Sequence, residues 1–167
     1  MLTRRSSSVP VSDPALRAVL LGIAAGSRSM TPNAVLALRY PSRGERWTGW
    51  VPYRWPLGRG ALVLGMVGEF VGDKLPGTPS RLQPGSLAGR AASGALAGAA
   101  IGSDGGSAGI ARGAILGAAG ALAGSFGGYW LRKTLVEKSG LPDLPIALVE
   151  DAVAVGLAAA ATDRRGA

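Results

Sequence analysis

Apolar residues along the chain are gathered into long runs, which polar, proline-rich or basic connections separate. The runs contain almost no charged residues, and their length and composition favour α-helices. The pattern therefore predicts an all-α protein. The runs cover 15–25 together with 34–38, 60–72, 86–103, the glycine-rich stretch that follows a turn at 104–106, and 145–161.

The first run is interrupted by the polar sequence GSRSMTPN at 26–33. Asp13 and Pro14 are typical of a helix N-cap and first turn, so we expect a helix from about Ala15. Pro32 lacks a backbone N–H and disfavours helical conformation at the residue before it. The segment therefore predicts two half-helices with a polar break between them.

Glycines recur at four-residue spacing on both sides of the turn at 104–106. Small residues at this spacing leave a smooth stripe along a helix, which lets two helix backbones approach closely in lipid. A flexible linker is the alternative, but glycine-rich linkers lack the Ile, Leu, Val and Ala residues interleaved here. We expect an antiparallel helix pair with glycine-zipper packing, which uses Gly94, Gly98, Gly102, Gly109, Gly113, Gly117, Gly120, Gly124 and Gly128.

Composition indicates an integral membrane protein. Of the 167 residues, 47% are hydrophobic, only 17% are charged and 27 are glycine, whereas soluble domains average about 25% charged residues and about 7% glycine. The net charge is +8, but the basic residues lie in the connections, as membrane topology requires, so no nucleic-acid partner is expected. Without cysteine or histidine, the chain lacks disulfide, thiol, zinc and Ser-His-Asp chemistry, and no cofactor is expected.

The placement of arginines distinguishes two membrane topologies. A conventional five-span model divides the basic residues nearly evenly between the two sides. If the first segment instead enters the membrane and returns, the basic loop 39–59 and both chain ends lie together on the cytoplasmic side. We favour this arrangement, with four transmembrane helices plus a broken, re-entrant N-terminal helix in the bacterial inner membrane. The polar N-terminus is 1–14, the membrane domain 15–161 and the basic tail 162–167.

The basic loop 39–59 contains a cluster of aromatic residues. Trp47, Trp50, Tyr53 and Trp55 lie within nine residues of one another. Such a cluster predicts an aromatic anchor at the membrane interface. An aromatic-lined binding site is the alternative.

Few polar side chains lie in or beside the apolar runs, and these form the candidate site. Glu69 and Asp73 are four residues apart, so on a helix their carboxylates share a face, where they would bind a metal cation or exchange protons. Charges in the bilayer are costly and usually pair, so Glu150 and Asp151 would complete this site or pair with arginines. Half-helix ends form ion sites in many transporters. The predicted cluster comprises Arg28, Thr31, Asn33, Glu69, Asp73, Lys74, Arg90, Glu150 and Asp151.

These features favour a transporter or channel-like protein for a cation or small solute. The alternative is a structural or assembly protein whose glycine-stripe helices pack into homo- or hetero-oligomers, while the charges only fix the fold. No nucleophile has a base beside it and no phosphate-binding motif is present, so an enzyme is not expected. The expected partners are the lipid bilayer, the transported solute and a second copy of the chain.

Four stretches together resemble a family of small bacterial membrane proteins known as domain-of-unknown-function family 4126. They are GIAAGSRSMTPNAVLA at 22–37, GEFVGDKLPGTPSR at 68–81, GRAASGALAGAA at 89–100 and ALVEDAVA at 147–154. This resemblance implies an integral membrane protein and brings no established activity.

The motif from Glu69 to Lys74 has a second likeness. It is similar to the Glu-x-Gly-Asp-Lys motif of small cation/proton exchangers that handle calcium and manganese. This chain has one extra residue between the glutamate and the glycine, and it has only Glu150 and Asp151 in place of a second copy of the motif. The likeness implies cation exchange as a hypothesis.

Overall fold

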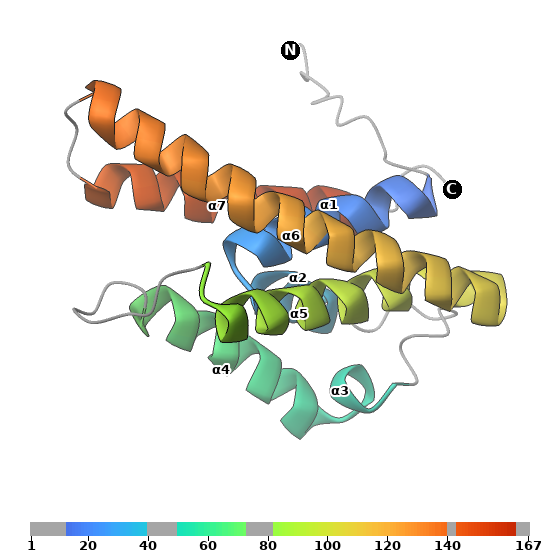
Figure 1. Ribbon diagram of the computed structural model, residues 1–167. Coiled ribbons are helices and arrows are strands. Elements are labelled where there is room, and N and C mark those ends of the chain that lie inside the picture. The colour runs from blue at the N-terminus through green and yellow to red at the C-terminus, as the bar shows by residue number, and fades with distance from the viewer. Residues whose placement is uncertain (1–12, 40–49, 73–81, 140–142, 163–167) are drawn as a thin grey trace, which may run out of the picture.

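The computed structural model describes residues 13–39, 50–72, 82–139 and 143–162, and all regular structure in these ranges is helical (Figure 1). This confirms the predicted all-α class. The helices are α1 (Pro14–Ser27), α2 (Thr31–Leu38), α3 (Val51–Arg54), α4 (Pro56–Gly72), α5 (Pro84–Gly102), the short 3-10 turn η2 (Ser103–Gly105), α6 (Gly106–Ser139) and α7 (Asp143–Thr162).

The predicted break in the first segment is present, and the two half-helices lie antiparallel to each other. Gly26, near the end of α1, lies beside Arg90 in the second turn of α5. Gly22, one turn earlier, lies at the level of Gly94, because both pack against the backbone oxygen of Gly117. Earlier residues of α1 therefore lie level with later residues of α5, so these two helices are antiparallel.

The second half-helix runs in the opposite direction. Asn33, in the first turn of α2, donates a hydrogen bond to Ser93 of α5, and one turn later Leu36 and Ala37 share a hydrophobic cluster with Ile101. Helix α2 is therefore parallel to α5, and the chain reverses at Arg28–Met30. The two half-helices therefore form a helical hairpin.

Helices α5 and α6 (Figure 1) make the most extensive contact among the described helices, and glycines line this contact. Gly94, Gly98 and Gly102 face Gly117, Gly113 and Gly109 so closely that a methyl group on any of them would overlap the opposing backbone. The antiparallel pair that the glycine spacing predicts is present.

The rest of the glycine stripe on α6 has other neighbours. Gly120 and Gly124 pack against α1 at Val19 and Ile23 rather than against α5, and Gly128 lines a groove between α6 and α7. The stripe on α6 thus serves two contacts, one with each neighbouring helix.

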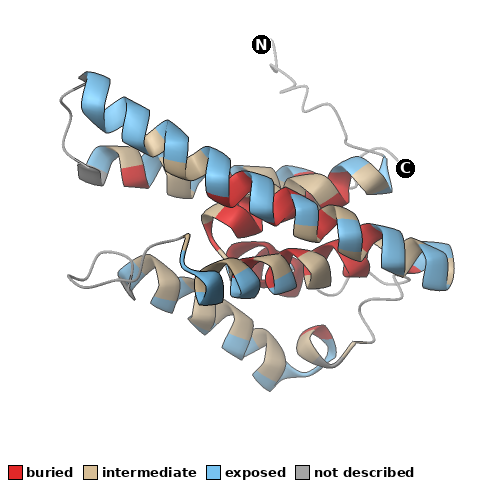
Figure 2. Ribbon diagram, in the orientation of Figure 1, coloured by how far each residue is buried: buried red, intermediate tan, exposed pale blue. Residues whose placement is uncertain are grey.

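The hydrophobic core is built from buried residues of α1, α2, α5 and α7 together with Tyr53 of α3, and most of them are alanine. Figure 2 shows where the buried residues lie. Three arginines attach helix ends to this core. Arg90 donates to carbonyl oxygens at the end of α1, Arg59 Nε to Ala37 O of α2 at 3.1 Å, and Arg17 Nε to Ala161 O of α7 at 2.6 Å. The last carbonyls of a helix have no partner within it, so these arginines satisfy groups that would otherwise be buried unpaired.

The prediction of an aromatic interfacial loop at 39–59 is partly wrong. Within its described residues, α3 and the first turn of α4 are helical, because Pro56 suits the first turn of a helix. Tyr53 is fully buried in the core, where its hydroxyl donates to Asn33, and Trp50 packs against the same core. Trp55 is exposed as expected of an anchor. Trp47 lies outside the described residues.

Two helical stretches, 84–138 and Pro145–Thr162, are long and apolar enough to cross a membrane by length and composition. This finding rests on length and composition alone, and a core helix of a soluble protein passes the same test. The first stretch folds back at η2 into α5 and α6. Helix α4, expected to be a span, has only 17 residues and does not meet this criterion.

Candidate functional site

The break between α1 and α2 is the centre of the candidate site. Helix α1 ends at Ser27, Arg28 takes an extended backbone conformation (φ −140°, ψ 104°), and α2 begins at Thr31. Such a break leaves carbonyl groups at the end of α1 and N–H groups at the start of α2 without partners in their own helices. In an apolar environment these groups must be satisfied from elsewhere.

Glu69 of α4 satisfies the start of α2. Its carboxylate accepts hydrogen bonds from the backbone N–H of Ser29 at 2.7 Å and of Met30 at 2.9 Å. The Ser29 hydroxyl also donates to it, at 2.9 Å. Because the N-terminus of a helix carries a partial positive charge, a carboxylate there is stabilised electrostatically as well. Glu69 thus acts as an N-cap supplied by a different helix.

Arg90 of α5 satisfies the end of α1. Its Nη1 donates to the carbonyl oxygen of Ser27 at 2.9 Å and also to that of Gly26. The Ser125 hydroxyl from α6 donates to the same Gly26 oxygen at 3.2 Å. Arg90 is only 6% exposed, so its charge is stabilised by carbonyl groups at the negative end of the α1 dipole.

Arg28, in the break itself, pairs with Asp151 of α7. Arg28 Nε donates to Asp151 Oδ1 at 2.5 Å, and Nη2 contacts the same oxygen. The guanidinium carbon also lies 5.3 Å from the centre of the Phe70 ring, which gives a cation–π contact. Arg28 is 1% exposed and Asp151 is 14% exposed, so the pair is largely buried. It confirms the predicted contact between 26–33 and the 150–151 pair.

A network of neutral side chains lies beside the charges. Asn33 Nδ2 donates to the Ser93 hydroxyl at 2.7 Å, and the Tyr53 hydroxyl donates to Asn33 Oδ1 at 2.5 Å. Ser93 in turn donates to the Ser29 carbonyl oxygen. Thr31 is fully buried, and its hydroxyl makes no hydrogen bond within the described part of the chain.

Several predicted residues are therefore brought together and others are not. Asp151 pairs with Arg28, as one of the predicted alternatives had it, whereas the Glu150 carboxylate lies 3.9 Å from Arg132 of α6. The reason is helical geometry, since neighbouring residues on α7 point about 100° apart. Asp73 and Lys74 lie outside the described residues. In the described part, no group of three side chains is placed to hold a metal ion together.

Ser93, Ser125 and Tyr53 belong to the site, although the sequence did not identify them as site residues. Serines among alanines and glycines carry little signal, and Tyr53 lies in a basic aromatic stretch that resembles an interfacial anchor. A signal was present for Ser93, since it falls three residues after Arg90 and so shares its helix face.

Chemically, the break combines two carboxylates, two arginines and two helix ends in a small, mostly apolar region. Carboxylates and helix ends are both groups that can bind ions. No family model, curated protein or solved structure matches the chain, so the argument for function rests on this geometry.

Proposed function

We propose that this chain is an integral membrane transporter or channel-like protein that passes a cation or small solute through the break between α1 and α2. The observation that carries the proposal is the convergence of Glu69, Arg28, Asp151 and Arg90, from four different segments, on one helix break. Charges at membrane depth are costly and usually mark a substrate or ion pathway. Broken helices with polar ends are the usual way in which transporters build such sites.

The proposed topology has α4, α5, α6 and α7 as spans and the α1–α2 hairpin as a re-entrant element. Large apolar side chains on outer faces are exposed, such as Leu64 at 72%, Ile115 at 69% and Val149 at 64%, which fits contact with lipid. Irregular backbone at membrane depth is tolerated only where protein or water covers it. In the break, Arg28 is 1% exposed and Glu69 accepts the backbone N–H groups of Ser29 and Met30.

The proposed orientation places the end of the bundle opposite the break in the cytoplasm. That end has the larger number of described cations, as the positive-inside rule requires. They are Arg17, Arg39, Arg54, Arg59 and Arg112, against Arg132, Lys133 and Lys138 at the end nearest the break. Arg90 is six residues into α5, so the break would lie about 9 Å inside the non-cytoplasmic surface, at 1.5 Å per residue.

Helix α4 is the element best placed to open the site. Its main contacts are with α2 and α3, and it is absent from the dense packing among α1, α5 and α6. Outward movement of α4 would withdraw Glu69 from Ser29 and Met30 and expose the start of α2.

Flux in proteoliposomes tests the proposal. Vesicles that contain the protein are assayed for uptake of protons, monovalent cations, divalent cations and small organic solutes, with Glu69→Gln and Glu137→Gln compared. Glu137 is the matched control, since it is 64% exposed on α6 and pairs only within its own helix with Lys133. We expect flux of one of these solutes, at least ten-fold lower in Glu69→Gln and unchanged in Glu137→Gln.

Absence of flux for every class of solute, or an equal loss of flux in Glu69→Gln and Glu137→Gln, contradicts transport. Either result favours the structural or assembly alternative. The glycines of the α5–α6 contact are already used within the chain. An oligomer would therefore have to use other surfaces, such as the exposed apolar face of α4 that includes Leu57, Leu64 and Val71.

A further inference from the structure

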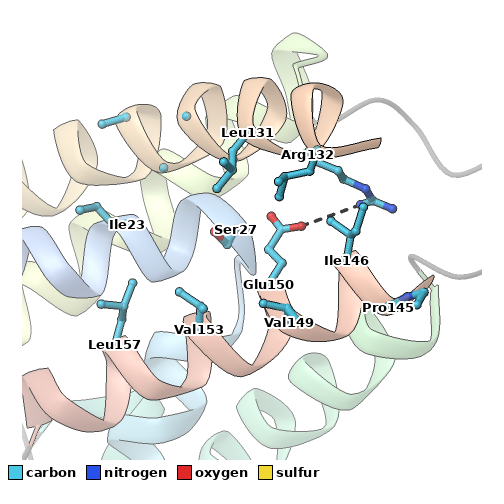
Figure 3. Close-up of a pocket in the computed structure, with 15 residues that line it drawn as sticks. Ile23, Ser27, Leu131, Arg132, Pro145, Ile146, Val149, Glu150, Val153 and Leu157 are labelled. Carbon is cyan, nitrogen blue, oxygen red and sulfur yellow. Dashed lines mark ion pairs between the residues drawn. The ribbon is translucent and has the colours of Figure 1, made fainter. Parts of the chain in front are cut away.

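An apolar groove of about 480 Å³ lies between α6 and α7, with the end of α1 at its base (Figure 3). This volume is within the range of small-ligand pockets. Figure 3 shows Val149, Val153 and Leu157 of α7 directed toward Ile23 of α1 and Leu131 of α6 across the space. The α6 side is lined by glycines, so α6 and α7, which make few contacts with each other, leave a long open space.

One end of this groove is charged and aromatic. Arg132 and Glu150 lie there, 3.9 Å apart, and Arg132 is 28% exposed (Figure 3). The next residue, Lys133, is 47% exposed and lies 5.3 Å from the centre of the Trp130 ring, and Tyr129 packs edge-on against Trp130. Consecutive aromatic and cationic residues at a helix end mark the headgroup level of a membrane.

We propose that this groove binds an anionic phospholipid, with one acyl chain against α6 and α7 and the headgroup phosphate on Arg132 and Lys133. This inference rests on the membrane placement in the proposed function, but it does not require transport. An acyl chain fits the apolar lining from Leu131 to Leu157, and the groove opens to the outside of the bundle, where lipid would lie.

Charge selects the headgroup. Arg132 lines the mouth of the groove and Lys133 is the next residue on α6; each pairs with one carboxylate of the chain, Glu150 and Glu137 respectively. Each cation has further N–H donors that a phosphate can accept from, and basic pockets between membrane helices bind anionic lipid headgroups in this way. Glu150 lies deeper, between Ser27 and Arg132 (Figure 3), so a headgroup at the mouth meets the cations first. A zwitterionic lipid has the same acyl chains but adds a choline cation, which Arg132 and Lys133 would repel.

Native mass spectrometry tests the proposal on the full chain. The detergent-purified protein is mixed with equal amounts of phosphatidylglycerol and phosphatidylcholine that have identical acyl chains. Each interfacial cation favours an anionic lipid by about five-fold, so we expect phosphatidylglycerol adducts to dominate by that factor or more. Equal adducts of the two lipids, or no adduct of either, would overturn the proposal.

Two variants locate the binding. Gly127 lines the groove, and a Cβ on it would meet no atom within 4 Å, so Gly127→Leu fills the groove without a clash and should remove most lipid adducts. Gly156→Leu is the matched control, because Gly156 on α7 is equally open but does not line the groove. Equal adducts in Gly127→Leu and Gly156→Leu would show that lipid binds elsewhere and would also overturn the proposal.

A second pair of variants tests the headgroup contact. Arg132→Gln combined with Lys133→Gln should abolish the preference for phosphatidylglycerol, whereas Arg112→Gln combined with Arg54→Gln changes net charge equally at exposed positions elsewhere. A preference that persists in the first pair contradicts the assigned headgroup site. Lipid adducts are measured without a transmembrane ion gradient, so they do not depend on transport. Absent lipid binding with intact flux refutes only the lipid site. Intact lipid binding with absent flux refutes only transport.

Discussion

The Arg28–Asp151 pair offers a prediction that separates folding from transport. Asp151→Leu leaves the Arg28 guanidinium, which is 1% exposed, without the carboxylate that accepts its Nε hydrogen bond. Removal of one partner of a buried ion pair costs about 3–5 kcal/mol, because the remaining charge is left in a low-dielectric region. Replacement of both partners by apolar residues of similar size is often close to neutral. The variant with both Arg28→Met and Asp151→Leu should therefore recover most of the lost stability.

The assay is a double-mutant cycle of unfolding free energies in detergent micelles or bicelles. We expect the summed losses of unfolding free energy in the two single variants to exceed the loss in the double variant by about 3 kcal/mol. This is the upper end of the coupling energies found for residues in direct contact. The stable double variant is then reconstituted, and we expect it to show no flux. Additive losses would refute the buried ion pair. Full flux in the stable double variant would refute the role of these charges in transport, whatever the stability data show.

Two further predictions concern packing and topology. Gly98→Ala should destabilise the protein by about 1–3 kcal/mol, because the added methyl group overpacks the α5–α6 contact. Gly89→Ala is the control on the same helix: its methyl group meets open space, so it should be neutral or stabilising. Equal effects of the two substitutions in thermal unfolding would contradict the described α5–α6 packing. The chain contains no cysteine, so Ser107→Cys should react with an impermeant maleimide only in inside-out membrane vesicles and Thr134→Cys only in right-side-out vesicles. Labelling of both from the same side would contradict the proposed topology.

The sequence predicts local structure well here because the signals are local. Proline at 32 and the polar run before it predict the break, and four-residue glycine spacing predicts which face of α5 meets α6. The partners of each charge depend instead on how α2 folds back along α1, which no local signal specifies. The sequence did not predict, for example, that Arg90 binds carbonyl oxygens of α1.

Glu150 and Tyr53 are two further residues whose surroundings could not be predicted from the sequence. Glu150 and Asp151 are adjacent in sequence, and only the rotation of α7 decides that Asp151 faces the break while Glu150 faces Arg132. Tyr53 lies among exposed basic and aromatic residues in sequence, yet α3 places its ring in the core beside Asn33. Composition averages over a stretch, whereas burial is decided residue by residue through tertiary packing.

The origin of each helix cap distinguishes a permanent structural break from one that can open. The start of α1 is capped locally, by the Asp13 carboxylate two residues before the N–H that it accepts, and local caps of this kind stay in place when other helices move. The start of α2 is capped by Glu69, forty residues away on the least packed of the long helices. A cap on a separate helix adds nothing to stability that a local serine or aspartate would not supply, but it can be withdrawn by moving that helix. The remote cap on α2 is therefore the feature expected of a site that must be both closed and opened.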